Sequence, residues 1–281
     1  MTASDHEPTG AALEYWFWTL HQPGLALLVD FIVRREPATL ELRVARWVDG
    51  VGSVERRFAD EWSIAGPTIS LDGGRLEPDG SAGRVGAVAW ELAWDRGPHL
   101  VDPRPRGPLH PLDLEALIRP SATFSGFVSV DDRRWDVDAA PGMLDHYWGP
   151  RLFDRWTWIS ATGFVDDPDR RLEAFVARSR VFGRTPPVMP LGYLWVGGGR
   201  DDDGEMTVSP VTGLVRSRRD GERIRLRSLR LDGKRHQLDC WAPADTFVDL
   251  GEGIRTTLLG DADLDGRSAR PGTVGLEFRR G

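Results

Sequence analysis

The chain has 281 residues, of which 40% are hydrophobic and 28% are charged, and its formal net charge at pH 7 is -7. This composition is typical of a globular protein with a substantial core, and the negative charge argues against a nucleic acid as partner. The single cysteine, Cys240, excludes an intramolecular disulfide and a cysteine-cluster metal site.

The sequence carries no sign of targeting to a membrane or for secretion. Its first residues, MTASDHEPTGAALEYW, lack the positive charge and the apolar run of a signal peptide. No window approaches the ~20 apolar residues of a membrane span. We therefore expect a soluble cytoplasmic protein without stable membrane insertion, whose oligomeric state stays open.

Strands are predicted along most of the chain, because apolar, β-branched and aromatic residues alternate with polar ones. They fall at 25–33, 39–48, 86–94, 123–139 (a hairpin with its turn at 131–133), 172–182, 191–199, 206–217, 223–231, 235–242 and 253–260. Turn sequences such as DDDGE and LDGK separate the later strands by roughly 8–12 residues, the spacing of sandwiches and barrels.

Three segments interrupt this rhythm. The proline-rich segment 97–111 cannot be a central strand and is predicted to be a long loop of the kind that acts as a lid. The segment 110–120, HPLDLEALIRP, is predicted to hold one short helix that ends at Pro120. The polar stretch 166–170 indicates a domain boundary. The expectation is an all-β fold of two tandem barrels or sandwiches, covering 10–165 and 166–281.

The common motifs of catalytic nucleophiles, cofactor sites and metal sites are missing from the sequence. There is no G-x-S-x-G, no H-E-x-x-H and no P-loop. Four histidines, His6, His99, His110 and His236, are scattered without the spacing of metal ligands. Lys234, the only lysine, lies in a predicted exposed turn, a poor place to lower the pKa of an amine. We expect neither a metal nor an organic cofactor.

Tryptophan is the unusual residue of this chain, with twelve against three tyrosines. Several gather at 142–160, GMLDHYWGPRLFDRWTWIS, and at 14–21, EYWFWTLH. Strand alternation sorts these side chains into faces: Asp145 with Tyr147, His146 with Trp148, Trp156 with Trp158, and Glu14 with Trp16 and Trp18. Each aromatic wall then has a titratable group close by.

Two interpretations of these walls stay open. In the structural one, the tryptophans are core, Asp145 caps a turn and the backbone satisfies His146. In the functional one, the rings line a cavity for a large apolar molecule, where their π faces stabilise a passing carbocation. A carboxylic acid buried among such rings has a raised pKa and can donate a proton near neutral pH. Acid and aromatic rings together are what protonation of an isolated alkene requires.

The segment 125–164 resembles the signature region of the hydroxyneurosporene synthase (carotenoid hydratase) and AttH-like family. That region has a hairpin, then Asp-His-x-Trp-Gly, here at 145–149, and then W-x-W, here at 156–158. The segment 14–36, EYWFWTLHQPGLALLVDFIVRRE, is similar to the opening of the family. The relatives of the family include tocopherol cyclases and lipocalin-like pericyclases, and its fold is two tandem lipocalin-like β-barrels.

The resemblance implies a cofactor-independent hydratase or cyclase, pericyclases included, acting on a double bond of an apolar isoprenoid or polyketide. Asp145 is then the candidate acid, and His146 is its orienter or a second acid–base group. The expected substrate-binding residues are Glu14, Trp16, Trp18, Tyr147, Trp148, Trp156 and Trp158. Two alternatives are a lipocalin-like protein that binds an apolar molecule without chemistry, and a structural pair of barrels that serves an assembly.

Overall fold

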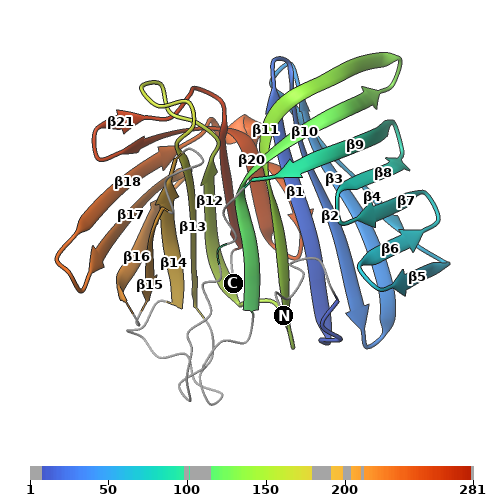
Figure 1. The fold of residues 1–281 in the computed structure, drawn as a ribbon, viewed down its shortest axis with the longest axis horizontal. Coiled ribbons are helices and arrows are strands. Elements are labelled where there is room, and N and C mark those ends of the chain that lie inside the picture. The colour runs from blue at the N-terminus through green and yellow to red at the C-terminus, as the bar shows by residue number, and fades with distance from the viewer. Residues whose placement is uncertain are drawn as a thin grey trace. The chain divides into compact units, whose positions relative to one another are not determined.

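The computed structural model describes residues 8–97, 101, 115–178, 191–198, 204–209 and 212–279. The chain divides into two compact units, with the bulk of the second beginning at Phe153. Each unit contains one eleven-stranded sheet, blue to green in the first and olive to red in the second (Figure 1). Among the described residues the only helical element is the 3-10 turn Ala244–Thr246. The all-β fold predicted from the sequence is confirmed.

The first sheet is antiparallel, and its first and last strands in the chain pair with each other in the interior of the sheet. Its strands are β1 (Leu13–Gln22), β2 (Leu25–Arg35), β3 (Ala38–Val48), β4 (Val51–Phe58), β5 (Trp62–Ala65), β6 (Thr68–Leu71), β7 (Gly74–Glu77), β8 (Gly80–Val85), β9 (Val88–Arg96), β10 (Glu115–Val130) and β11 (Arg133–Gly149). Their order is β4-β3-β2-β1-β11-β10-β9-β8-β7-β6-β5. Only β1 and β11 are neighbours that do not follow one another in the chain, and this pairing brings the two tryptophan-rich segments of the unit side by side.

The second sheet is built from the rest of the chain. Its strands are β12 (Arg155–Ala161), β13 (Arg171–Arg178), β14 (Leu191–Gly197), β15 (Glu205–Ser209), β16 (Gly213–Asp220), β17 (Arg223–Arg230), β18 (Arg235–Trp241), β19 (Val248–Gly251), β20 (Ile254–Leu264), β21 (Arg267–Ser268) and β22 (Val274–Arg279). The order is β15-β14-β13-β12-β22-β20-β18-β17-β16, with β19 and β21 paired to β20. The expected domain boundary at 165/166 lies after β12, whereas β12 pairs with β13 and β22 of this sheet.

Each sheet encloses its own hydrophobic core. In the first unit, Trp16, Trp18 and Leu20 of β1 pack with Phe31 of β2 and Phe124 of β10. β2 is buried on both faces from Leu25 to Val33, so its sequence is a continuous apolar run rather than an alternation. In the second unit, Ile159 of β12 and Leu276 of β22 belong to a separate core.

The helix predicted at 110–120 is wrong for the part that the structure describes. Residues from Glu115 onward form the start of β10, where Leu117 pairs with His146 and Ile118 with Asp145. A short apolar run does not distinguish helix from strand, and a proline at its end is typical of a helix stop. Pro120 instead lies where the β10–β11 register shifts, between Arg119 and Ala122, and a bulge tolerates its missing N–H.

Two other expectations fall partly outside the described residues. Of the loop expected at 97–111, the structure describes only Gly97 and Val101, so its role as a lid stays a prediction. The strand expected at 172–182 is described as far as Arg178. In the described parts of the chain no helix has the length and apolar character that crossing a membrane requires.

Candidate functional site

The pairing of β1 with β11 sets the faces of the site. Glu14 lies opposite Trp148, Trp16 opposite His146, and Phe17 opposite Asp145. Directly opposed residues of neighbouring strands project from the same face of a sheet. The predicted separation of the Asp145 face from the His146 face is therefore confirmed, and Glu14, Trp16 and Trp18 share the face of His146.

His146 contacts two indole rings. Its imidazole stacks on Trp16 with ring centroids 4.4 Å apart and an interplanar angle of 13°. The Trp148 ring lies 4.7 Å away at 43°. The side chain of His146 is only 2% exposed. Two electron-rich rings thus contact a group that titrates near neutral pH in ordinary surroundings.

Glu14 is the ionic partner of this histidine. Its buried carboxylate accepts hydrogen bonds from the Thr9 N–H (2.7 Å), the Gly10 N–H (2.8 Å) and Arg35 Nη2 (3.0 Å). His146 Nε2 lies 3.4 Å from Glu14 Oε2, at the long end of hydrogen-bond distance. Burial by itself raises the pKa of Glu14, but hydrogen bonds from His146, Thr9, Arg35 and Gly10 outweigh it and lower the pKa from 4.5 to about 2. Glu14 is therefore an anion near neutral pH.

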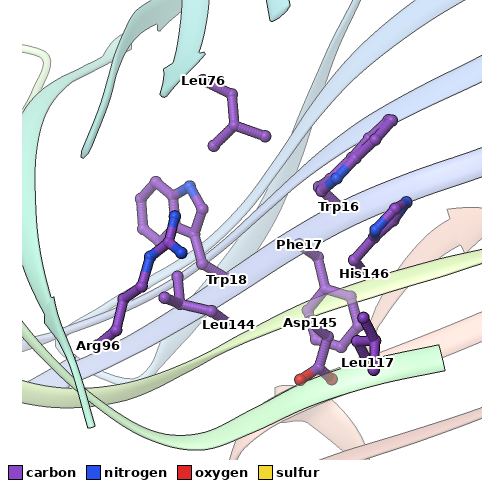
Figure 2. A pocket seen from close by; sticks show the side chains of 9 residues that line it. All are labelled: Trp16, Phe17, Trp18, Leu76, Arg96, Leu117, Leu144, Asp145 and His146. Carbon is purple, nitrogen blue, oxygen red and sulfur yellow. The ribbon is translucent and has the colours of Figure 1, made fainter. Parts of the chain in front are cut away.

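Asp145 lies on the opposite face, among tyrosine and phenylalanine rings. Tyr147 stacks on Tyr15 with centroids 5.0 Å apart and on Phe17 at 5.9 Å. Figure 2 shows the Asp145 carboxylate and the Phe17 ring directed away from the Trp16 and His146 rings. The tryptophan face accordingly contains Glu14 and His146, whereas Asp145 shares its face with Tyr147, as strand alternation predicted.

A small cavity lies in the sheet beside this histidine (Figure 2). Its volume is about 20 Å³, room for about one water molecule. The lining residues are Trp16, Phe17, Trp18, Leu76, Arg96, Leu117, Leu144, Asp145 and His146. A larger ligand can enter here only if some of these side chains move.

The structure divides the expected tryptophan wall between the two units. Trp16, Trp18 and Trp148 belong to the first, whereas Trp156 and Trp158 lie on β12 of the second. Trp156 donates a hydrogen bond from Nε1 to Glu277 Oε1 at 2.9 Å. The wall that one unit can form by itself consists of three indoles.

Sequence reasoning missed the groups that hold Glu14. Arg35 comes from the end of β2, and the sequence did contain a signal for its position. The turn at Pro23 and Gly24 fixes the β1–β2 register, which places the end of β2 beside the start of β1. Thr9 and Gly10 act through backbone N–H groups, for which the sequence offers no signal. Within the described ranges no cluster of three or more His, Cys, Asp or Glu residues could hold a metal ion.

Comparison with known proteins places the fold. No protein-family model matches the chain. Two curated proteins of Mycobacterium tuberculosis, Uncharacterized protein MT0513 (strain CDC 1551 / Oshkosh) and Uncharacterized protein Rv0493c (strain ATCC 25618 / H37Rv), are each 31% identical to it over 216 residues. That match covers 66% of this chain and 64% of each relative, slightly less than two thirds of their length.

Solved structures resemble the chain over nearly its whole length. A protein assigned as AttH from Nitrosomonas europaea superposes with a TM-score of 0.69 at 17% identity, covering 99% of this chain and 95% of that one. Kievitone hydratase from Nectria haematococca gives 0.63 at 11% identity, covering 99% and 91%. CghA with Sch210972 gives 0.62 at 12% identity, covering 96% and 88%. The chain has the AttH-like fold of two tandem lipocalin-like β units.

Proposed function

We propose that this chain is a cofactor-independent enzyme that hydrates or cyclises a double bond of an apolar isoprenoid or polyketide, with His146 moving the proton. The observation that carries the proposal is the buried Glu14–His146 pair, whose imidazole contacts the rings of Trp16 and Trp148. The fold shared with a kievitone hydratase supports the reaction class as an analogy.

The charge of Glu14 determines which role it and His146 each have in the proposed reaction. A carboxyl group with a pKa of about 2 is ionised near neutral pH, so Glu14 accepts hydrogen bonds and does not supply a proton. A carboxylate beside an imidazole orients the ring and stabilises its protonated form. His146 is thereby the proton carrier on the tryptophan face, and Glu14 is its positioning residue.

The proposed reaction needs only this pair and the indoles. The imidazolium gives its proton to one carbon of the double bond, and the π electrons form the new C–H bond. Positive charge develops on the other carbon, next to the faces of Trp16 and Trp148. In hydration, water adds to this carbon and loses a proton to the imidazole. In cyclisation, a second double bond supplies the electron pair, and the resulting cation returns a proton to the imidazole.

The test compares variants of His146 and Asp145, neighbouring residues whose side chains lie on opposite faces of the sheet. Wild-type protein incubated with terpenoid and polyketide alkenes should give a product heavier by one water, or an isomer of unchanged mass, by mass spectrometry. His146→Gln should lose roughly 10²–10⁴-fold in turnover, the usual contribution of an acid–base group, while staying folded. Asp145→Asn should keep most of its turnover. The reverse pattern in folded proteins would assign the proton transfer to Asp145.

A second candidate is a lipocalin-like binding protein without chemistry. The tight packing of the site favours it, because a water-sized cavity and a fully hydrogen-bonded Glu14 are also what a structural ion pair provides. For a binding protein, saturable ligand binding by the wild type without any product would be observed, and His146→Gln would change neither.

A further inference from the structure

In the first core, the indoles of Trp16 and Trp18 differ from those of Trp90 and Trp94 in their hydrogen bonding. Trp90 donates from Nε1 to Ser81 Oγ at 2.9 Å, and Trp94 donates to the Pro78 carbonyl at 3.0 Å. Trp16 Nε1 and Trp18 Nε1 are buried yet have no hydrogen-bond partner in the part of the chain that the structure describes. Their side chains are 2% and 1% exposed, so bulk water does not reach them.

Both of these tryptophans line the cavity beside His146. Trp16 and Trp18 belong to its wall, and Figure 2 shows their nitrogens on the ring edges that face the space between the two indoles. A buried N–H without an acceptor loses its hydration and gains nothing in return, so native proteins rarely leave two such groups in one place. The arrangement indicates that an acceptor beyond the described residues completes the cavity.

The size and charge of the cavity restrict what this acceptor is. A cavity of about 20 Å³ has room for one oxygen atom and few further atoms. Arg96 also lines it, and an arginine cation favours an oxygen with partial negative charge. A carbonyl oxygen has two lone pairs and can accept from two N–H groups at once.

We propose that the cavity binds one oxygen acceptor through the indole N–H groups of Trp16 and Trp18, a water in the free protein and a carbonyl oxygen of the substrate in the complex. The inference rests on the proposed function and narrows its substrate class. The substrate is an apolar molecule that carries an oxygen near the reacting double bond, rather than a pure hydrocarbon.

The test observes the indole N–H groups directly, in full-length protein labelled with ¹⁵N-tryptophan. Cyclohexanone and methylenecyclohexane serve as probes because they have nearly the same shape and differ in C=O against C=CH₂. Cyclohexanone should shift two of the twelve indole signals saturably, whereas methylenecyclohexane should leave them in place. Before addition, the same two signals should show magnetisation transfer from a bound water.

Single substitutions assign the signals and measure the contribution of each donor. Trp16→Phe and Trp18→Phe should each remove one responding signal and weaken cyclohexanone binding about 2- to 10-fold, the range of one hydrogen bond. Trp90→Phe is the matched control, because its indole lies in the same core but already donates to Ser81. It should leave cyclohexanone affinity unchanged.

The outcomes separate the sources of the oxygen and the fate of the two proposals. Water transfer without any response to cyclohexanone would make the acceptor a bound water alone and overturn the substrate part. Equal responses to both probes, or neither water transfer nor response, would overturn the whole inference, and the wild-type spectrum decides this even if a variant fails to fold. No turnover enters these measurements, so responding indoles in a protein that never forms product would refute the proposed function only.

Discussion

At the scale of single residues, two buried carboxylates on neighbouring strands have pKa values shifted in opposite directions. Glu14 accepts from two backbone N–H groups and from Arg35, and its pKa falls to about 2. For Asp30, burial has the largest effect and raises the pKa, although Arg43 Nε lies 2.6 Å away and opposes it. For Glu14, hydrogen bonds from His146, Arg35 and two backbone N–H groups together outweigh the effect of burial on the pKa.

The depressed pKa of Glu14 predicts how stability depends on pH. Its pKa of about 2 in the folded protein lies below the 4.5 of an unperturbed glutamate, so the unfolded chain takes up the proton first as the pH falls. The stabilisation is complete above about pH 4.5 and disappears as the pH approaches 2. Its upper size is about 3 kcal/mol, because each tenfold difference in proton affinity between the two states corresponds to about 1.36 kcal/mol. Urea unfolding at pH 7, 4 and 3 should show this loss in the wild type.

Glu14→Gln is the matched variant for this prediction. It should be less stable than the wild type at pH 7, with the difference shrinking toward pH 3 because the wild type has then lost more than half of the ionic contribution. Parallel pH profiles for the two proteins would mean that Glu14 titrates alike in the folded and unfolded chains. The strong hydrogen bonding of its carboxylate would then contribute no pH dependence.

At the scale of elements, the contact of β1 with β11 depends on one residue without a side chain. A Cβ atom at Gly142 would lie 1.8 Å from the Thr19 carbonyl oxygen and 2.6 Å from the Phe124 ring. Backbone cannot yield as a flexible side chain can, so Gly142→Ala should force β11 away from β1. We expect a loss of roughly 1–3 kcal/mol in the free energy of unfolding, the usual cost of overpacking.

Chemical denaturation checks this expectation against a glycine that has room. Gly198→Ala is the control, because a Cβ there would meet its nearest atoms at 3.5 Å or more. If Gly142→Ala unfolds at the same urea concentration as Gly198→Ala, the two strands tolerate separation. The β1–β11 contact would then not be what holds Trp16 against His146.

The elements also show how far the sequence predicts this molecule. Long strands such as β3 and β17 were predictable from the alternation of their side chains, and β2 from its run of β-branched and aromatic residues. The short strands β5 to β8 escaped, since four to six residues carry too little periodicity. The faces of Glu14 and His146 followed from alternation, but their meeting did not. It depends on the register of strands far apart in the chain, which only tertiary packing fixes.

At the scale of the whole molecule, the site occupies only part of the chain. Each unit has its own core, and the Glu14–His146 pair and the cavity belong entirely to the first. The cavity has the size of a water molecule, whereas the proposed substrates are many times larger. Ligand binding therefore requires core side chains of the first unit to rearrange, and both tryptophan emission and stability should report it.

The last prediction follows from this requirement. A panel of terpenoids, polyenes and fatty acids, titrated into the protein, should include ligands that quench tryptophan fluorescence saturably. Trp16 and Trp18 line the cavity, and Trp148 contacts His146 in its wall. A ligand at 100 times its Kd stabilises the folded state by about 2.7 kcal/mol, which raises Tm by roughly 5 °C in a chain of this size.

Comparing His146→Gln with the wild type then distinguishes an enzyme, a binding protein and a structural protein. His146→Gln should retain the quenching and the rise in Tm but lose product, because it removes the proton carrier and leaves the indoles. A binding protein would give quenching and stabilisation in both proteins and product in neither. A structural pair of β units would give no saturable quenching and no rise in Tm with any ligand. In that case the closed packing around His146 is the function of these residues, and the Glu14–His146 pair serves only to hold β1 against β11.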